Sequence, residues 1–421
     1  MYKITFLQTD LSKGGAERRI AVLANGLAKM GVDVEIALFE SGEVAYPLDD
    51  RVKIVLIDSL HYPYKSSLDR IVHRIKDVGF NILLAFPLRV FAHIIRPIWK
   101  KPTLFYETKR EDHKYEENIG RNIREYVRKN PDRTLISFTS ATVLKTAPAL
   151  SNIRHGCLII SESADPSWNT NTSFDQKRNY YYNQADVCVF QTPGAMEYFP
   201  QSIQDKGVVI PNPVTDCLPE SWKKERQKAV VNYCRLDPVK NLELLIDAFA
   251  LFRKKHSDYE LYIYGDEPDY LTHLNYKESL HQRIVKLNLD ECVNILPFRK
   301  DIHDVVRSYA MYVSSSDHEG LSNAMLEAMA IGLPVICTDC PSGGAAFAIE
   351  NYQNGILVPV KDAERMAEAM CYLVENPVGA AQMAERATAI KDRLSQEAIC
   401  ERWLELIKEK STYHETDPSK C

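Results

Sequence analysis

The chain has 421 residues and a formal net charge of −5, with 45% hydrophobic and 26% charged residues. This composition is ordinary for globular domains with a buried core, so it excludes disordered, collagen-like and coiled-coil chains, and the length favours two or three domains. Because 57 acidic residues outnumber 52 basic ones, the chain has no overall basic field for nucleic acid, which we exclude as a partner.

The first 40 residues predict a strand, a helix and a second strand. Residues 2–8 are strand-like, and residues 16–30 place apolar side chains from Ile20 to Met30 at steps of 3, 4 and 3, on one face of a helix. Residues 32–39 are again strand-like. Since two strands joined by a helix pair in parallel, this unit predicts a parallel sheet.

The alternation continues and then breaks at residues 211–213, where Pro-Asn-Pro and a charged stretch mark a domain boundary. The strands expected before the break are 133–138, 157–161, 186–190 and 207–210, and those after it are 229–234, 259–264, 293–298, 311–316, 334–338 and 355–359. We predict two doubly wound α/β domains, residues 1–212 and 213–395, and a helical tail at 396–421 that crosses back to the first domain. Ligands of such sheets bind beyond the carboxyl ends of the strands, here in the cleft between the domains.

Gly14 and Gly15 lie in the loop between the first predicted strand and the first helix. Glycines there let backbone N–H groups approach a ligand closely at a helix N-terminus, where the dipole favours anions. A tight turn between strand and helix would need the same residues, and the dinucleotide-binding pattern Gly-x-Gly-x-x-Gly is absent. Both interpretations of this loop stay open.

Arg235 and Lys240 belong to the loop between the strand at 229–234 and a helix that Asn241 caps. A guanidinium fork and a mobile ammonium group at such a turn suit a diphosphate. Solvated loop charges are the alternative interpretation.

Residues 317–334, DHEGLSNAMLEAMAIGLP, carry the strongest signal. Ser322 or Asn323 is expected to cap a helix, so that Glu319 lies on the loop and Glu327 inside the helix. The N–H groups between the two carboxylates lie at the positive end of the helix dipole, where an anion is favoured. The carboxylates can accept hydrogen bonds from sugar hydroxyls. A capped helix with surface glutamates is the alternative, but it fits Glu319 poorly because the neighbours of this residue are small and apolar.

Glu319 and Glu327 have the Glu-x7-Glu spacing of retaining glycosyltransferases with the GT-B fold, family 4, which this chain resembles. Similar text occurs in the expected order in KGGAERRIAVLANGLAKMGVDVEIA (13–37), CRLDPVKNLELLIDAFA (234–250), EGLSNAMLEAMAIGLPVICTDCPSGG (319–344) and NGILVPVKD (354–362). ISESADP at 160–166 is similar to the Ser-Glu-Arg-Asn-Asp-Pro signature of a subgroup that extends bacterial capsular or lipid-linked oligosaccharides. The resemblance covers nearly the whole chain and implies two Rossmann-like, doubly wound parallel-sheet domains that face each other across a cleft.

The resemblance implies a role for each matching residue. Arg235 and Lys240 would bind the donor diphosphate, Glu327 the ribose hydroxyls and Glu319 the transferred sugar. The other donor-binding residues would be Gly320, Leu321 and Ser322 through their N–H groups, Gly14 and Gly15 on the opposite wall, and Arg299 near the base. The donor would be a nucleotide diphosphate sugar, expected to be a UDP-linked hexose or N-acetylhexosamine, and the acceptor a growing glycan or a polyprenyl-diphosphate-linked oligosaccharide of capsule or lipopolysaccharide synthesis.

The chain departs from this family in its first domain. Many members place a histidine there, against the donor sugar, but residues 161–165 contain none, and we expect Glu162 to act as the catalytic partner instead. Fixed cations and amides stabilise a departing diphosphate, and no Asp-x-Asp occurs in the sequence, so we expect neither a metal nor another cofactor. Cys337 and Cys340 form a lone CxxC pair, a weak signal for zinc.

The resemblance also implies retention of the anomeric configuration, for which two routes are open. Glu319 could act as a covalent nucleophile, as in retaining glycoside hydrolases, or the acceptor could attack from the front face while the leaving phosphate oxygen takes its proton. We favour front-face attack because the motif is better suited to hold the donor than to attack it. Two alternative functions also stay open: a sugar-nucleotide epimerase of the same fold and a non-catalytic protein that binds nucleotide sugars.

Residues 88–101 predict a basic amphipathic helix within a long segment, about 62–130, that is expected to be an insertion. Its basic side consists of Arg89, His93, Arg96 and Lys100. Such helices lie in anionic membrane interfaces, although a helix packed on its own sheet has the same pattern. The sequence lacks a signal peptide and a uniform apolar span, and its ten scattered cysteines indicate a reducing compartment. We therefore predict a cytoplasmic protein attached peripherally to the inner face of the cell membrane.

Overall fold

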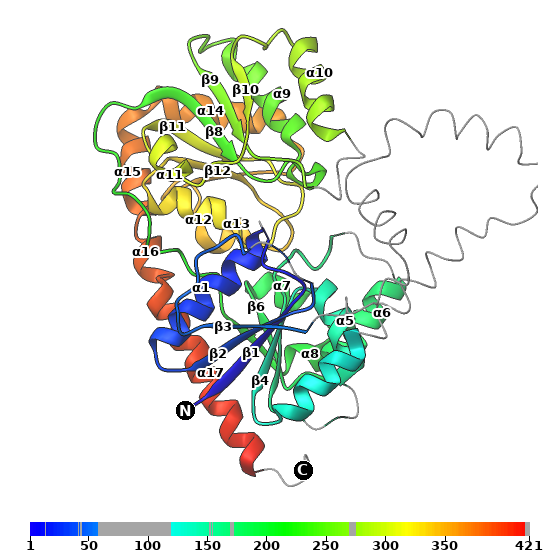
Figure 1. Ribbon diagram of the computed structural model, residues 1–421. Helices are drawn as coiled ribbons and strands as arrows, with labels where there is room; N and C mark the ends of the chain where they lie inside the picture. Colours follow the sequence, from blue (N-terminus) through cyan, green and yellow to red (C-terminus); the bar gives the residue numbers. More distant parts are fainter. Residues whose placement is uncertain are drawn as a thin grey trace, which may run out of the picture.

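The computed structural model describes residues 1–12, 14–40, 42, 44–57, 119–150, 153, 155–168, 172–268 and 275–416. These residues form two lobes, one above the other in Figure 1, and each lobe is built on a parallel sheet. The predicted basic helix at 88–101 and most of the predicted insertion lie outside the described residues.

The first domain contains a seven-stranded sheet in the order β3-β2-β1-β4-β5-β6-β7, with every neighbouring pair parallel. The strands are β1 (Lys3–Gln8), β2 (Asp33–Leu38), β3 (Lys53–Leu56), β4 (Thr134–Phe138), β5 (Leu158–Ser161), β6 (Val187–Phe190) and β7 (Gly207–Val209). The helices are α1 (Gly15–Lys29), a helix at 119–129, α5 (Ser140–Leu150), α6 (Thr172–Tyr182), α7 (Pro193–Glu197) and α8 (Gln201–Gln204).

The second domain contains a six-stranded sheet in the order β10-β9-β8-β11-β12-β13, again parallel throughout. The strands are β8 (Gln227–Tyr233), β9 (Glu260–Tyr264), β10 (Val293–Leu296), β11 (Tyr309–Ser314), β12 (Val335–Thr338) and β13 (Ile356–Val358). The helical elements are the 3₁₀ turn η1 (Pro238–Lys240), α9 (Leu242–Arg253), α10 (Tyr276–Lys286), α11 (Ile302–Val306), α12 (Asn323–Ala330), α13 (Gly344–Ala348), α14 (Ala363–Glu375), α15 (Pro377–Ala387) and α16 (Ile390–Arg393).

The strand order places the candidate loops at the centre of each sheet. In the second sheet β8 lies between β9 and β11, so the direction of winding reverses between β8 and β11. Crevices at such reversals, beyond the carboxyl ends of the strands, are where open α/β sheets bind ligands. The segments 234–241 and 315–322 leave the carboxyl ends of β8 and β11 at this point, and they face the first domain.

The last helix, α17 (Gln396–Thr416), returns to the first domain. Just before α17 the chain crosses from the second domain back to the first. This crossing lies beside the earlier one, since the Val214 N–H donates to the Leu394 carbonyl at 2.7 Å. α17 runs along α1 in Figure 1, and Gly26 of α1 permits this contact, since a Cβ there would lie 2.3 Å from Cys400 Sγ. Trp403 of α17 is completely buried, 6.0 Å from the ring of Phe138 on β4.

Candidate active site

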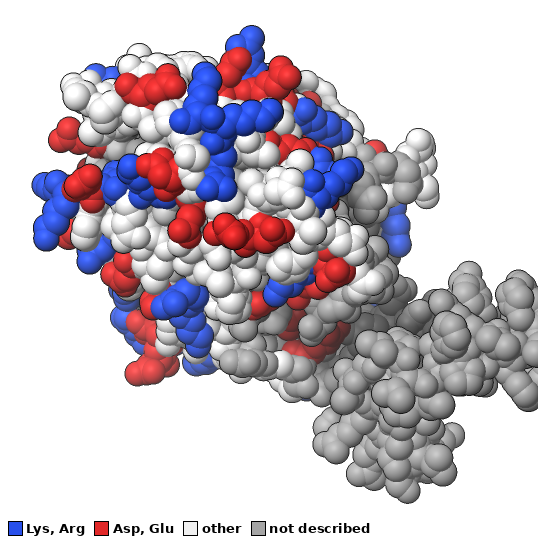
Figure 2. All heavy atoms as spheres, turned by 90° about the horizontal axis from the view of Figure 1, so that it is seen from above, with Lys and Arg blue, Asp and Glu red and all other residues white. Residues whose placement is uncertain are grey.

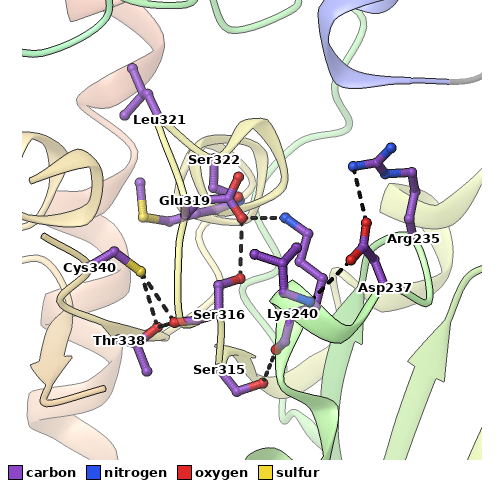
Figure 3. A network of polar contacts seen from close by, with 12 residues as sticks. Arg235, Asp237, Lys240, Ser315, Ser316, Glu319, Leu321, Ser322, Thr338 and Cys340 are labelled. Carbon is purple, nitrogen blue, oxygen red and sulfur yellow. Dashed lines mark hydrogen bonds and ion pairs between the residues drawn. The ribbon is translucent and has the colours of Figure 1, made fainter. Parts of the chain in front are cut away.

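Lys240 and Glu319 form an ion pair between the loops that follow β8 and β11 (Figure 3). Ser316 Oγ also donates to Glu319 Oε2, at 3.2 Å. The side chains of the pair are only 16% and 25% exposed, so water screens their charges weakly. Burial by itself would lower the pKa of Lys240, but the Glu319 carboxylate more than offsets this effect and the pKa is raised, so the amine is charged at neutral pH.

Local hydrogen bonds hold the Lys240 loop in place. The buried carboxylate of Asp237 caps η1 by accepting from Val239 N–H at 3.1 Å. Asn241 adopts a left-handed conformation with φ 44°, which asparagine tolerates better than most residues, and its Oδ1 caps α9 at Leu244 N–H, 3.2 Å away. Its Nδ2 donates to Asp317 Oδ1 at 2.9 Å and so ties the two candidate loops together.

Arg235 lies beside this pair but nearer to solvent, with 47% of its side chain exposed and its Nη2 3.6 Å from Asp237 Oδ2 (Figure 3). It also faces the first domain, where it acts on Glu17 of α1. Burial raises the pKa of Glu17, and the positive charge of Arg235 opposes this shift. The structure thus places two cations, one buried and one accessible, at the carboxyl end of β8.

The loop before α12 packs directly against the first domain. Ser322 caps α12 through Met325 N–H, as predicted for one of two residues. The N–H of the buried Leu321 donates to Gln191 Oε1 at 2.9 Å, so a first-domain side chain takes one of the amides expected to face the donor. Gly320 is a glycine because a Cβ would lie 2.5 Å from Gln191 Oε1 and 3.3 Å from the Ser163 carbonyl.

Glu327 lies inside α12 and is 5% exposed. Its carboxylate contacts Arg18 Nη1 of α1 at 2.7 Å and His303 Nε2 at 2.8 Å. Arg18 and Glu327 line a small pocket between the domains together with Arg19, Val22, Pro213, Thr215 and Asn323. Glu327 is therefore turned towards the first domain, in a different group of contacts from the Lys240–Glu319 pair.

Gly14 and Gly15 form the opposite wall. Tyr46 OH donates to the Gly14 carbonyl at 2.9 Å, and Gly14 N–H donates back to this hydroxyl at 3.1 Å. A Cβ at Gly14 would collide with the Glu17 carboxylate. The Gly15 carbonyl lies 3.4 Å from Asn323 Nδ2 of α12, so the glycine loop meets the N-terminal end of that helix.

Glu162, expected as a catalytic partner, is 2% exposed, and its hydrogen bonds within the described part of the chain are to first-domain residues. Oε1 accepts from the N–H groups of Ser163 and Ala164 at 2.9 and 3.1 Å. Oε2 accepts from Ser140 Oγ at 2.5 Å and from Tyr182 OH at 2.8 Å. A carboxylate with four donors is well suited to hold its own loop, and the structure does not bring it to the Lys240–Glu319 pair.

We expect Glu162→Ala to lower the free energy of unfolding by about 3 kcal/mol, because buried donors would lose their acceptor. The substitution would also affect the buried Arg19. Burial lowers the pKa of Arg19 to about 9, and the negative charge of Glu162 opposes this shift. Urea unfolding measures the loss, and Glu125→Ala, at an exposed ion pair with Lys129, is the control expected to change nothing measurable. Lost activity at unchanged stability would instead give Glu162 a direct part in the reaction.

Arg299 follows β10 on the surface and pairs with Asp301 at 2.7 Å, with 46% of its side chain exposed. The structure does not bring it to the other predicted residues. Seen from above, the second domain carries basic and acidic side chains interspersed on the same face (Figure 2).

The sequence does not predict the residues that join the two walls of the cleft. Asn212 Nδ2 donates to the Leu321 carbonyl at 3.0 Å, and Thr192 Oγ1 donates to the Ser342 carbonyl at 2.8 Å. His318 Nδ1 lies 3.0 Å from Asp165 Oδ2. These are single polar residues without periodicity, and their one signal in the sequence is that each lies within a few residues of a strand end.

Among the described residues, no helix is long and apolar enough to cross a lipid bilayer. Within the same part of the chain, the side chains of His256, Cys371 and Glu375 are the group of three that could hold a metal ion. His256 lies just before β9, at the end of the sheet away from the cleft, so this group is not part of the candidate site.

Comparisons with known proteins concern the second domain and the overall fold. Residues 217–390, which include β8 to α15, match the family model described as glycosyl transferases group 1. An uncharacterized glycosyltransferase of Haemophilus influenzae is 24% identical over 408 residues, which cover 96% of this chain and 99% of that protein. A poly(ribitol-phosphate) alpha-N-acetylglucosaminyltransferase of Staphylococcus aureus is 30% identical over 184 residues, 44% of this chain and only 36% of that enzyme.

Among solved structures, Anabaena HepE in complex with UDP superposes with a TM-score of 0.71 at 18% identity, over 97% of this chain and 100% of that one. At this identity the likeness concerns the fold, which is GT-B: two parallel-sheet α/β domains. Together the comparisons show a match to the group 1 family model over residues 217–390 and a GT-B fold over 97% of the chain.

Proposed function

We propose that this chain transfers a sugar, a hexose or an N-acetylhexosamine, from a UDP-linked donor to a growing glycan or a polyprenyl-linked oligosaccharide. The observation that carries the proposal is the buried Lys240–Glu319 pair, with Arg235 beside it, at the reversal point of the second sheet. The group 1 match of this domain, the UDP bound in HepE and the glycan-building activity in the name of the Staphylococcus aureus relative support it.

Cleavage of the bond between sugar and diphosphate creates negative charge on the leaving group. Preorganised cations at that point lower the barrier because they need no rearrangement as the charge develops. In the proposed site, Lys240 and Arg235 hold the diphosphate, and Glu319 accepts hydroxyl hydrogen bonds from the transferred sugar. Lys240 is suited to this role because its amine stays charged despite its burial.

In the same proposal Glu327 binds the ribose hydroxyls. Its two oxygens are engaged by Arg18 and His303, so a ribose would displace Arg18 and share the carboxylate with His303. The remaining predicted donor contacts, from Gly14, Gly15, Gly320, Ser322 and Arg299, stay predictions.

We propose further that the reaction retains the anomeric configuration by front-face attack and needs no metal. Two fixed cations at the diphosphate supply the charge that a divalent ion would otherwise bring. EDTA should therefore leave transfer unchanged, while a covalent sugar on Glu319 found by mass spectrometry would favour the other route. Attachment to the cytoplasmic face of a membrane stays a prediction of the sequence, since its basic helix lies outside the described residues.

We expect UDP to raise the melting temperature of the protein. A ligand at a hundred times its Kd stabilises the folded state by about 2.7 kcal/mol, and UMP should stabilise less because it has no β-phosphate for Lys240 and Arg235. Thermal unfolding with UDP, UMP, ADP and GDP measures the difference. A protein that no nucleoside diphosphate stabilises would contradict the proposal.

Incubation with a UDP-sugar alone separates the proposed transferase from an epimerase of the same fold. A transferase releases UDP slowly by hydrolysis and leaves the remaining donor unchanged, whereas an epimerase converts the sugar without any acceptor. Chromatography of the nucleotide sugars distinguishes the two outcomes, and binding without either product would indicate a non-catalytic protein.

A further inference from the structure

His318 bridges the two walls of the cleft at the residue next to Glu319. Its Nδ1 lies 3.0 Å from Oδ2 of Asp165, which belongs to the loop after β5 in the first domain. The Asp165 side chain is 2% exposed, whereas that of His318 is 34% exposed. A buried carboxylate of one domain thus orients a partly exposed imidazole of the other.

The orientation of Asp165 is fixed by its own contacts. Its Oδ1 accepts from Ser167 N–H at 2.9 Å and from Ser167 Oγ at 2.6 Å, which leaves Oδ2 for the imidazole. The loop is held further by Glu162, which accepts from Ala164 N–H. Gly320 packs against this loop, so the segment 318–320 and the first-domain wall are in direct contact.

This contact determines which imidazole nitrogen carries the proton. An ionised carboxylate only accepts hydrogen bonds, so Nδ1 must donate, and in the neutral ring Nε2 keeps its lone pair. Within the part of the chain that the structure describes, no protein group is hydrogen-bonded to Nε2. The result is an oriented hydrogen-bond acceptor beside Glu319.

We propose that His318 binds the transferred sugar, the Nε2 of its neutral imidazole accepting a hydrogen bond from a sugar hydroxyl, and that Asp165 is the positioning residue that holds the single ring proton on Nδ1. This inference rests on the proposed function, because it assigns a contact within the same donor site. It also gives the site two neighbouring acceptors from the loop after β11, the Glu319 carboxylate and the His318 imidazole.

Two substitutions separate this role from a structural one. In His318→Asn, the side-chain amide can still donate to Asp165 Oδ2, so the bridge stays while Nε2 is lost. In Asp165→Asn, the carbonyl oxygen is needed by Ser167, so the NH₂ group faces the imidazole. Nδ1 must then accept, and the proton moves to Nε2, which turns the proposed acceptor into a donor.

The experiment measures UDP binding by calorimetry and UDP release from UDP-glucose and UDP-N-acetylglucosamine for the wild type and both variants. We expect UDP affinity to stay within twofold, while kcat/KM for UDP release falls roughly tenfold, as the loss of one hydrogen bond implies. The ¹⁵N spectrum of the imidazoles, with the His318 signal identified by its absence in His318→Asn, should show the proton on Nδ1 in the wild type and on Nε2 in Asp165→Asn.

The outcomes distinguish this inference from the proposed function. If the wild type binds UDP and consumes a UDP-sugar but His318→Asn does so equally well, His318 only bridges the domains and the inference is wrong. A wild-type spectrum with the proton on Nε2 would overturn it as well. If the wild type neither binds UDP nor consumes either UDP-sugar, both the proposed function and this inference are wrong.

Discussion

Replacement of Lys240 by methionine is expected to lower kcat/KM for sugar transfer by about 10²–10³-fold, the loss found when one preorganised transition-state contact is removed. Methionine keeps much of the apolar length of the side chain but removes the charge that we place at the leaving diphosphate. The Glu319 carboxylate would keep its hydrogen bond from Ser316, so the loop is expected to stay folded. Transfer of a radiolabelled sugar from UDP-sugar to an oligosaccharide acceptor measures the effect.

Lys228→Met is the matched control. Lys228 lies at the start of β8 and, like Lys240, pairs with a carboxylate, that of Asp258, but both partners are more than half exposed. Its loss should leave transfer unchanged. Lys240→Arg keeps the positive charge and should retain more activity than Lys240→Met. Equal transfer by the wild type and Lys240→Met would contradict the assignment of the diphosphate site.

Trp403→Ala is expected to lower the free energy of unfolding by about 3–5 kcal/mol, the usual cost of removing a large ring from a packed core. Trp403 is completely buried although it lies near the C-terminus, and it stacks obliquely on Phe138 of the first domain. Urea or thermal unfolding measures the loss, which should appear in the transition of the first domain if the two domains unfold separately.

Two further substitutions show whether this loss comes from packing. The indole N–H of Trp403 is buried without a hydrogen-bond partner in the described chain. Trp403→Phe keeps an aromatic ring, removes the unpaired donor and should cost much less than alanine. Trp168→Ala, at a side chain 46% exposed, should change stability little. If Trp403→Ala lowers the free energy of unfolding no more than Trp168→Ala does, α17 contributes nothing to the core.

Much of the fold could be predicted because its elements are encoded locally. The apolar face from Ile20 to Met30 appears as α1, and the apolar runs of the second half appear as β8 to β13. β3 was not predicted, because it has four residues, lies at the edge of the sheet and exposes Ile54 and Leu56. A strand with so little burial has no pattern that distinguishes it from a loop.

The candidate site likewise has a part that the sequence predicts and a part that it does not. Lys240 and Glu319 could be predicted because each lies in a capped loop-to-helix motif, and they meet because their strands are neighbours in the sheet. Contacts between the domains could not be predicted, since they depend on how two complete domains pack. Arg18 reaches Glu327 and His318 reaches Asp165 only across that interface, and neither pair lies within one motif.

The return of α17 also has a consequence for the order in which the protein forms during synthesis. The first domain needs Trp403 of α17 and its neighbours to fill its core. Residues 214–394 therefore separate, in chain order, the first domain from the helix that completes it. On the ribosome the first domain emerges first and is completed last, after the whole second domain. The nascent first domain therefore lacks the contact between Trp403 and Phe138 until the second domain has been synthesised.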